Sequence, residues 1–252
     1  MKFYRVLVAT IIAAIFLVAC SGDGSSESDK AQKNIPRAVT SKEAQLLSTA
    51  LSNNAKDQNA SFDITSGVLG SSGFVASGKV DWVNSNVQVE VSLFVKNQVD
   101  LKSVSTKDNV FESFLGLSNL ASESNLEGKD WIARGFDPTK YGIDVLSQFI
   151  AKLAALTPDN PILLKQSGAQ FLGVENIGGV QVSKFQNTPN VTYYLTKEGE
   201  MKKVSAKVKG FPSAVDVVFS DRTSTVIEVP NIDQAYSLNQ VSAFYPEKRP
   251  AF

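Results

Sequence analysis

The chain of 252 residues contains no histidine and a single cysteine. Without histidine, Ser-His-Asp and Cys-His catalytic arrangements are excluded, and so are histidine-containing zinc sites. A lone cysteine cannot form an internal disulfide, so an exported form of this chain has to be stabilised by a packed core. These absences remove the commonest routes to covalent and metal-dependent catalysis.

Motifs of other catalytic classes are also missing. The sequence contains no Ser-x-x-Lys tetrad, nucleophile elbow, Walker A loop or calcium-loop pattern. The glycines of residues 67–73 precede a predicted strand, which indicates a hairpin loop and not a phosphate site. Two carboxylate pairs remain, Asp137 with Asp144 and Asp216 with Asp221. Acidic side chains at a helix start are commonly stabilised by the exposed amides. We therefore expect a protein that is not an enzyme and has no cofactor or metal.

Cys20 ends the run Leu-Val-Ala-Cys, directly after an apolar stretch and before a polar one. Lys2 and Arg5 provide a positively charged start, and residues 6–18 form an apolar region of about 13 residues. This region is shorter than the roughly 20 residues that a spanning helix needs. The pattern predicts a bacterial lipoprotein signal peptide over residues 1–19 with Cys20 as the lipidated residue. The alternative is an ordinary secretory signal in which the cysteine is incidental.

Processing at Cys20 would determine where the protein works. A diacylglycerol on the thioether and an N-acyl chain such as palmitate supply the two anchors that stable membrane attachment requires. Loss of the leader removes two basic residues and leaves a net charge of −2. That charge gives no electrostatic footprint for nucleic acid. We expect a lipid-anchored protein on the extracytoplasmic face of the cell membrane, with no nucleic-acid partner.

The mature chain is predicted to hold one domain. Residues 20–39 combine the lipidated cysteine with a flexible tether, because Ser, Asp, Gly and Lys leave little apolar surface to bury. Residues 40–232 form the domain, and residues 233–252 are predicted as an irregular C-terminal tail because periodicity fades after Pro230. A capping-box pattern at Thr40 begins a predicted helix over 41–55.

Alternation with a period of two dominates the next segment and predicts strands. The clearest alternation covers residues 87–95, and a turn at 84–86 joins it to the alternating segment 74–83 as an antiparallel hairpin. The other predictions in this half are a strand from residue 61, strands near 98–106 and 109–114, and a loop over 116–128.

The most apolar helix is predicted over residues 137–156. Apolar side chains recur there at three and four residues, which leaves only Asp144, Ser147, Gln148 and Lys152 to face water. A short helical turn is predicted at 161–166. Six further strands are predicted near 168–176, 179–187, 190–197, 201–209, 214–220 and 225–229. The sum is an α+β fold, with an antiparallel sheet of about ten to eleven strands and two main helices.

A short basic run lies on one of the late strands. Its members are Lys202, Lys203, Lys207 and Lys209. Because they mostly alternate with apolar residues, we expect a solvated face, with contact to anionic lipid headgroups as the alternative.

Four stretches of the second half resemble the actinobacterial LppX/LprAFG family of LolA-like lipoproteins. They are residues 130–139 ahead of the apolar helix, 173–180 around a strand turn, 191–204 as a hairpin, and 217–221 as a closing strand. Arg222 departs from the pattern, since the family usually has an aromatic residue there. The resemblance implies a strongly curved antiparallel sheet, a half-barrel that wraps the helices. It also implies an apolar cavity for the acyl chains of a lipid or glycolipid and transport of that cargo within the cell envelope.

Alternation identifies the side chains that would face such a cavity. The predicted lining is Phe74, Val80, Trp82, Val89, Val91, Leu93, Leu146, Phe149, Ile150, Leu153, Val204 and Val208. Acyl chains need only a dry apolar wall, but an ordinary filled core would show the same pattern. The alternative function is a non-enzymatic envelope interaction module that docks a transporter or a cell-wall protein. A hydrolase or transferase that uses Asp137 or Asp221 is the third class.

Overall fold

The chain divides into residues 1–33 and a compact unit of residues 34–252. The structure, a computed structural model, describes residues 35–67, 73–93, 98–126, 128–223 and 226–250, apart from the side chains of 247 and 248. Cys20, the predicted lipidation site, and the glycine segment 68–72 therefore lie outside the described residues. Among the described helices, none has the length and hydrophobicity to cross a membrane.

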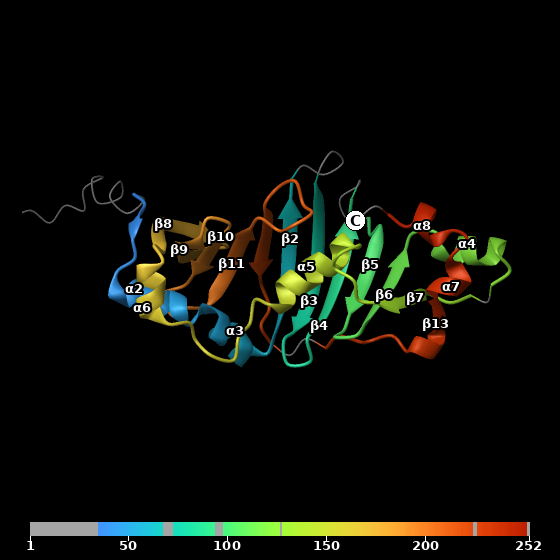
Figure 1. Ribbon diagram of the computed structural model, residues 1–252, viewed down its shortest axis with the longest axis horizontal. Coiled ribbons are helices and arrows are strands. Elements are labelled where there is room, and N and C mark those ends of the chain that lie inside the picture. Colours follow the sequence, from blue (N-terminus) through green and yellow to red (C-terminus); the bar gives the residue numbers. More distant parts are fainter. Residues whose placement is uncertain (1–34, 68–72, 94–97, 127, 224–225, 251–252) are drawn as a thin grey trace, which may run out of the picture. The chain divides into compact units, whose positions relative to one another are not determined.

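The fold is α+β, with one large and mostly antiparallel sheet (Figure 1). The strands are β1 Arg37–Ala38, β2 Asn59–Ser66, β3 Phe74–Asp81, β4 Asn86–Ser92, β5 Leu101–Ser105, β6 Asn109–Phe114, β7 Trp131–Gly135, β8 Gln170–Ile177, β9 Val180–Thr188, β10 Val191–Leu195, β11 Met201–Ala206, β12 Val215–Phe219 and β13 Ala235–Ser237. Their order is β1-β8-β9-β10-β11-β12-β2-β3-β4-β5-β6-β7-β13, with β13 parallel to β7. The pairing of β12 with β2 joins the two halves of the chain into one sheet.

Short helices accompany the sheet. They are α2 Ser41–Ser48, α3 Ala50–Asp57, α4 Leu117–Glu123, α5 Gly142–Ala151, α6 Pro161–Gln166, the 3-10 helix η1 Ile232–Gln234, α7 Leu238–Val241 and α8 Tyr245–Lys248. Helix α5 packs on β3, β4 and β5, and α3 packs on β2 and β11 (Figure 1). Helix α2 packs beside α6 at the end of the sheet that carries β8.

The predicted helices are present but shorter. The predicted helix 41–55 is interrupted at Thr49, whose hydroxyl donates to the Leu46 carbonyl at 2.9 Å. The predicted helix 137–156 is regular only over α5, because beyond it the Ala155 amide donates to the Leu51 carbonyl at 3.1 Å. The turn predicted at 161–166 is confirmed as α6.

The sheet in the described residues has thirteen strands, more than the ten to eleven predicted. Strand β1 lies within the predicted tether, and β7 was not predicted, because the buried Arg134 interrupts its apolar register. The strand predicted at 225–229 is wrong, since residues 226–229 pair with no strand. Residue 225 lies outside the described residues.

Two segments predicted as irregular contain regular structure. The predicted loop 116–128 contains α4, which buries Leu117 and Ala121. The tail after Pro230 contributes β13, α7 and α8, and buries Tyr236, Val241 and Tyr245 in the core. These elements are only three to seven residues long, so their periods are too brief to show in the sequence.

The two faces of the sheet differ in polarity, as alternation predicts. The helix-covered face carries the main apolar core, including Phe62, Val80 and Val89. On the opposite face, Lys203 pairs with Asp216 at 2.7 Å beside the Tyr194 ring. Over β5 to β7 that face is also apolar and packs against Ile227.

Candidate functional site

The candidate site is the apolar layer between the sheet and the helices α3 and α5, which pack on it. All twelve side chains predicted to line a cavity belong to one hydrophobic cluster, which covers this layer and extends beyond it. Ten of them are buried, and Leu93 and Phe149 are partly buried against the cluster. They come from β3, β4, α5, β11 and the turns that follow, so the two-residue and helical periods identified side chains that share one layer. Whether any of them contacts a ligand stays a prediction.

The sheet side of this layer is built by β3 and β4. Their antiparallel register places Val80 opposite Val87 and Gly78 opposite Val89. Gly78 also lies opposite Phe62 of β2, and a Cβ at this position would overlap the Phe62 ring and the Gln88 carbonyl oxygen. Glycine is therefore required there for the Phe62 ring to lie against the strand.

Helix α5 closes the layer with apolar side chains and polar contacts at its middle and end. Ile143, Leu146 and Ile150 are each 0% exposed. The Trp82 indole N–H donates to the Ile150 carbonyl at 3.1 Å, which satisfies a buried polar group at the helix end. Ser105 on β5 donates to Ser147 on α5 at 3.1 Å between their hydroxyl oxygens.

Two residues of α5 that were predicted to face water are buried. Asp144 is 0% exposed and Ser147 is 2% exposed. Asp144 accepts two hydrogen bonds from the Arg134 guanidinium, at 2.6 and 2.7 Å, and one from the Asp137 amide at 2.6 Å. The prediction was wrong for these two residues because their partners come from β7 and β5, which sequence spacing along the helix cannot show, whereas Lys152 is exposed as predicted.

A buried ionic cluster fixes the first turn of α5 to the sheet and the C-terminal segment. The Arg134 guanidinium bridges Asp144 and Glu112 of β6, with 2.6 Å to each carboxylate. Arg249 donates twice to Glu112 at 2.8 Å, and the Tyr245 hydroxyl donates to it at 2.5 Å. Removing one partner of such a cluster leaves a buried charge uncompensated, so the cluster locks these segments together.

The electrostatics of this cluster follow from its composition. Burial alone would raise the pKa of Glu112, but the hydrogen bonds and charge of Arg249 and Arg134 outweigh it and hold the pKa at about 2. Burial and the neighbouring Glu112 charge raise the pKa of Tyr245. Sequence reasoning missed this cluster. The one available signal was Glu112, which occupies an inward position in the alternation of β6.

Arg222, at a position where the resemblance implies an aromatic residue, closes the other end of the layer. Its guanidinium donates to Asn54 at 2.8 Å, to Asp57 at 2.7 Å and to the Met201 carbonyl. It also lies 5.2 Å from the centre of the Phe219 ring. Asn54 is itself 0% exposed and donates to the Leu153 carbonyl at 2.6 Å. An arginine here links α3, β11 and the end of β12, where an aromatic side chain would supply packing alone.

The carboxylates considered for catalysis do not assemble into a site. Asp137 and Asp221 are turn residues, and each accepts from the threonine two positions ahead. These hydrogen bonds lower the pKa of both carboxyls. Asp216 pairs with Lys203, and Lys202 of the same basic run pairs with Glu200 at 2.6 Å. Within the described part of the chain, no group of three or more acidic, histidine or cysteine side chains is placed to hold a metal.

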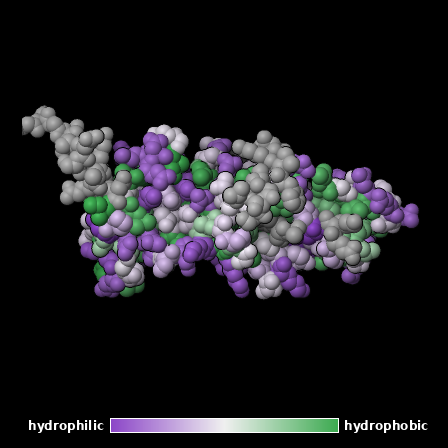
Figure 2. All heavy atoms as spheres, turned by 90° about the horizontal axis from the view of Figure 1, so that it is seen from above, coloured by the Kyte–Doolittle hydropathy of each residue, from purple (hydrophilic) through white to green (hydrophobic). Residues whose placement is uncertain are grey.

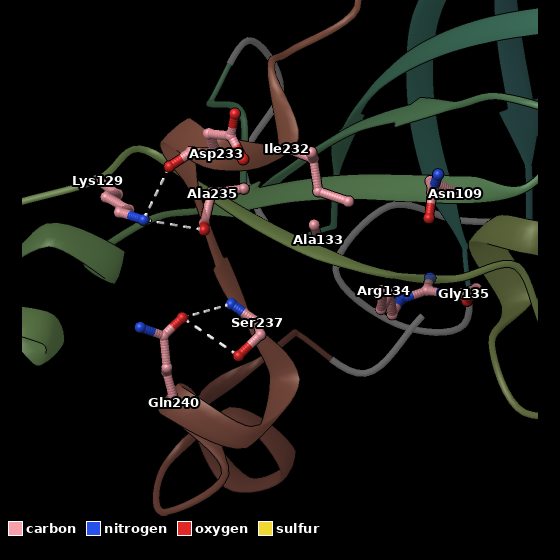
Figure 3. Close-up of a pocket in the computed structure, with 10 residues that line it drawn as sticks. All are labelled: Asn109, Lys129, Ala133, Arg134, Gly135, Ile232, Asp233, Ala235, Ser237 and Gln240. Carbon is pink, nitrogen blue, oxygen red and sulfur yellow. Dashed lines mark hydrogen bonds between the residues drawn. The ribbon is translucent and has the colours of Figure 1, made fainter.

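The structure has pockets bounded by described residues near β13, beside β2 to β4, and between α2 and α6. One, of about 490 Å³, is lined by Asn109, Lys129 and Ile232 near β13, and there Lys129 donates to the carbonyls of Asp233 and Ala235 (Figure 3). A second pocket, of about 450 Å³, lies at the ends of β2, β3 and β4. A third, of about 400 Å³, lies between α2 and α6. None of these three is lined by a predicted cavity residue.

The layer is therefore closed around its central side chains. Val80, Val89, Leu146, Ile150 and Val204 are each 0% exposed. A side chain with no accessible surface has no adjoining space, internal or external, that would admit a water-sized sphere. In this conformation the middle of the layer is a filled core.

Comparison with known proteins assigns no family, since no family model and no curated protein matches the chain. Among solved structures, the chain is similar to an uncharacterized conserved protein from Thermus thermophilus, with 10% identity and a TM-score of 0.41 over 77% of this chain and 99% of that one. It is also similar to a chain of the Pseudomonas aeruginosa MucA/MucB complex, with 11% identity and a TM-score of 0.31. That match covers 77% of this chain and 59% of the other.

Proposed function

We propose that this protein is a membrane-anchored envelope lipoprotein that binds the acyl chains of a lipid or glycolipid and carries them within the cell envelope. Cys20 would be the anchor, and the apolar layer under α5, with a sheet strongly curved around it, would be the binding site. The observation that supports the proposal is that all twelve predicted lining residues belong to one hydrophobic cluster on the helix-covered face of the sheet. Transfer of this kind uses no covalent chemistry of the protein.

Because the middle of the layer is closed, acyl chains would enter it only if the part of α5 beyond its ion-paired first turn moved away from the sheet. Over most of its length α5 faces the sheet with apolar side chains, and acyl chains can replace such contacts with little loss of hydrophobic stabilisation. The polar contact in the middle of the helix is the hydrogen bond between Ser147 and Ser105. A covalent link between these two positions would therefore hold the middle of α5 against β5.

The second candidate is an envelope interaction module that docks a transporter or a cell-wall protein. The filled middle of the layer favours it, since a core without space stabilises the domain and leaves recognition to its surface. The two candidates differ in whether α5 has to move.

A disulfide between α5 and β5 distinguishes the two candidate functions. Residues 34–252 contain no cysteine, so the double variant Ser105→Cys, Ser147→Cys would carry one possible disulfide. The two hydroxyl oxygens lie 3.1 Å apart, close enough for sulfur atoms to bond after small adjustments. The measurement is uptake of a fluorescent fatty acid and of a phospholipid, followed by mass spectrometry of extracted lipid.

We expect uptake by the reduced double variant and by the unmodified domain, and loss of most uptake on oxidation. The single variant Ser105→Cys, treated with the same oxidant, is the matched control. Equal uptake in the oxidised and reduced forms would show that α5 need not move. Absence of lipid from all forms, including protein purified without detergent, would exclude the carrier and favour the interaction module.

A further inference from the structure

Helix α6 and the segment before it expose apolar side chains at one end of the unit. Leu156 is 97% exposed, Ile162 64% and Leu163 60%, whereas Leu164 is buried against the core. Scattered apolar residues on a surface need no explanation. Here three of them fall within eight residues, together with the exposed Pro158. Figure 2 shows hydrophobic residues among hydrophilic ones at this end.

This segment is held firmly against α2 and α3. The Ala155 amide donates to Leu51 at 3.1 Å and the Asp159 amide to Ser48 at 2.9 Å. The Lys165 ammonium group donates to the Ser41 hydroxyl at 3.0 Å. The exposed apolar side chains are therefore displayed on a fixed support. We define the α6 face as Leu156, Ile162, Leu163 and Lys165.

The α6 face lies beside the point where the chain enters the domain. Strand β1 pairs with the start of β8, and the Val39 amide donates to the Ala169 carbonyl at 3.2 Å, three residues after α6 ends. Fourteen residues separate Cys20 from Ile35, the first described residue. Whatever their conformation, they span at most about 50 Å. Lipid chains on Cys20 would keep this end of the domain near the membrane.

The charges around the α6 face suit a lipid surface. Lys42 and Lys165 are exposed near it, and Asp159 is the exposed acidic residue of the segment. Arg37 and Glu43 neutralise each other at 2.7 Å. Apolar side chains flanked by lysines are the composition of elements that lie in the membrane interface, where the lysines reach the headgroups. A groove of about 400 Å³ between α2 and α6, lined by Ile162 and Lys165, offers space for a headgroup.

We propose that the α6 face docks on the lipid bilayer that holds the Cys20 anchor, with Leu156, Ile162 and Leu163 inserted at the level of the headgroups. This proposal rests on the proposed membrane anchoring. Docking would fix the orientation of the domain on the membrane, which a tether alone leaves free. The cargo would then pass between the bilayer and the domain at a defined distance.

The test uses the lipidated full chain in vesicles of phosphatidylethanolamine and phosphatidylglycerol. With Cys20 acylated, Ile162→Cys introduces the one free thiol of the chain, which is labelled with an environment-sensitive fluorophore. Val83→Cys is the matched control, because Val83 is also 64% exposed but lies in the turn between β3 and β4. Quenchers attached to the lipid acyl chains then report contact with the bilayer.

We expect quenching at position 162 to exceed that at position 83 several-fold. Substituting Ile162→Ser and Leu163→Ser should abolish quenching of a label at Leu156→Cys without unfolding the domain, since both side chains are exposed. Acylation of Cys20, measured by mass, and flotation with vesicles report the anchor separately. Equal quenching at positions 162 and 83 in an anchored chain would overturn docking. The label could instead be shielded without lipid quenching in a chain that sediments as a dimer. That result would assign the α6 face to contact with a second copy of the chain and would also overturn docking on the bilayer.

Discussion

Truncation of Leu146 and Ile150 to alanine measures how completely the apolar layer is filled. Each side chain is 0% exposed and packs between α5 and the sheet. Removing its carbon atoms forfeits about 2 kcal/mol of transfer free energy. The cavity left in a packed core adds to this, so the total loss of unfolding free energy should be about 3 to 4 kcal/mol for each variant. If the layer were open space, the cavity contribution would vanish.

Urea unfolding of residues 34–252, followed by tryptophan fluorescence, gives the values directly. Trp82 lies in the layer and reports its loss, while Trp131 lies on the opposite face near Ile227. The matched control is Ile162→Ala, which removes an exposed side chain and should change the unfolding free energy by about 0.5 kcal/mol or less. Losses of about 2 kcal/mol or less for both Leu146→Ala and Ile150→Ala, the transfer free energy alone, would refute a filled layer and point to an existing acyl-chain cavity.

Two further predictions concern the strand β3 and the buried ionic cluster beside the layer. Gly78→Ala should lower the unfolding free energy by about 1 to 3 kcal/mol, because the new Cβ meets the Phe62 ring. Gly135→Ala is the control, because a Cβ there has open space and should leave the stability nearly unchanged. Equal decreases in the urea midpoints of the two variants would contradict this prediction. The folded-state pKa of Glu112 is about 2, below its ordinary value of 4.5, so its stabilising contribution is present above pH 4.5 and is lost as the pH falls toward 2. Glu43, also held at about 2, first by its hydrogen bond to Arg37, adds a loss in the same direction. Glu112→Gln should therefore be less stable at neutral pH and flatten part of the acid decline, and an unchanged slope of stability against pH would count against the cluster.

Local sequence patterns predicted much of the fold. Alternation placed Val80 and Val89 on the covered face of the sheet, because successive side chains of a strand point to opposite faces. It failed where a polar residue occupied an inward position, as Arg134 does in β7. Such a residue is tolerated only when distant partners neutralise it, and distant partners leave no trace in a local period.

The sequence by itself determined that this chain lacks histidine chemistry, which apolar side chains share a layer, and where a lipid anchor is expected. Each of these depends on residue identity or on a repeat within a few residues. Only the tertiary structure decided that β12 joins β2, that Glu112, Arg134, Asp144 and Arg249 form one buried cluster, and that the middle of the layer is filled. These features depend on long-range contacts and on the volume left between elements. Hydrophobic periodicity cannot predict them, because it specifies the direction in which a side chain points and not the space that remains beside it.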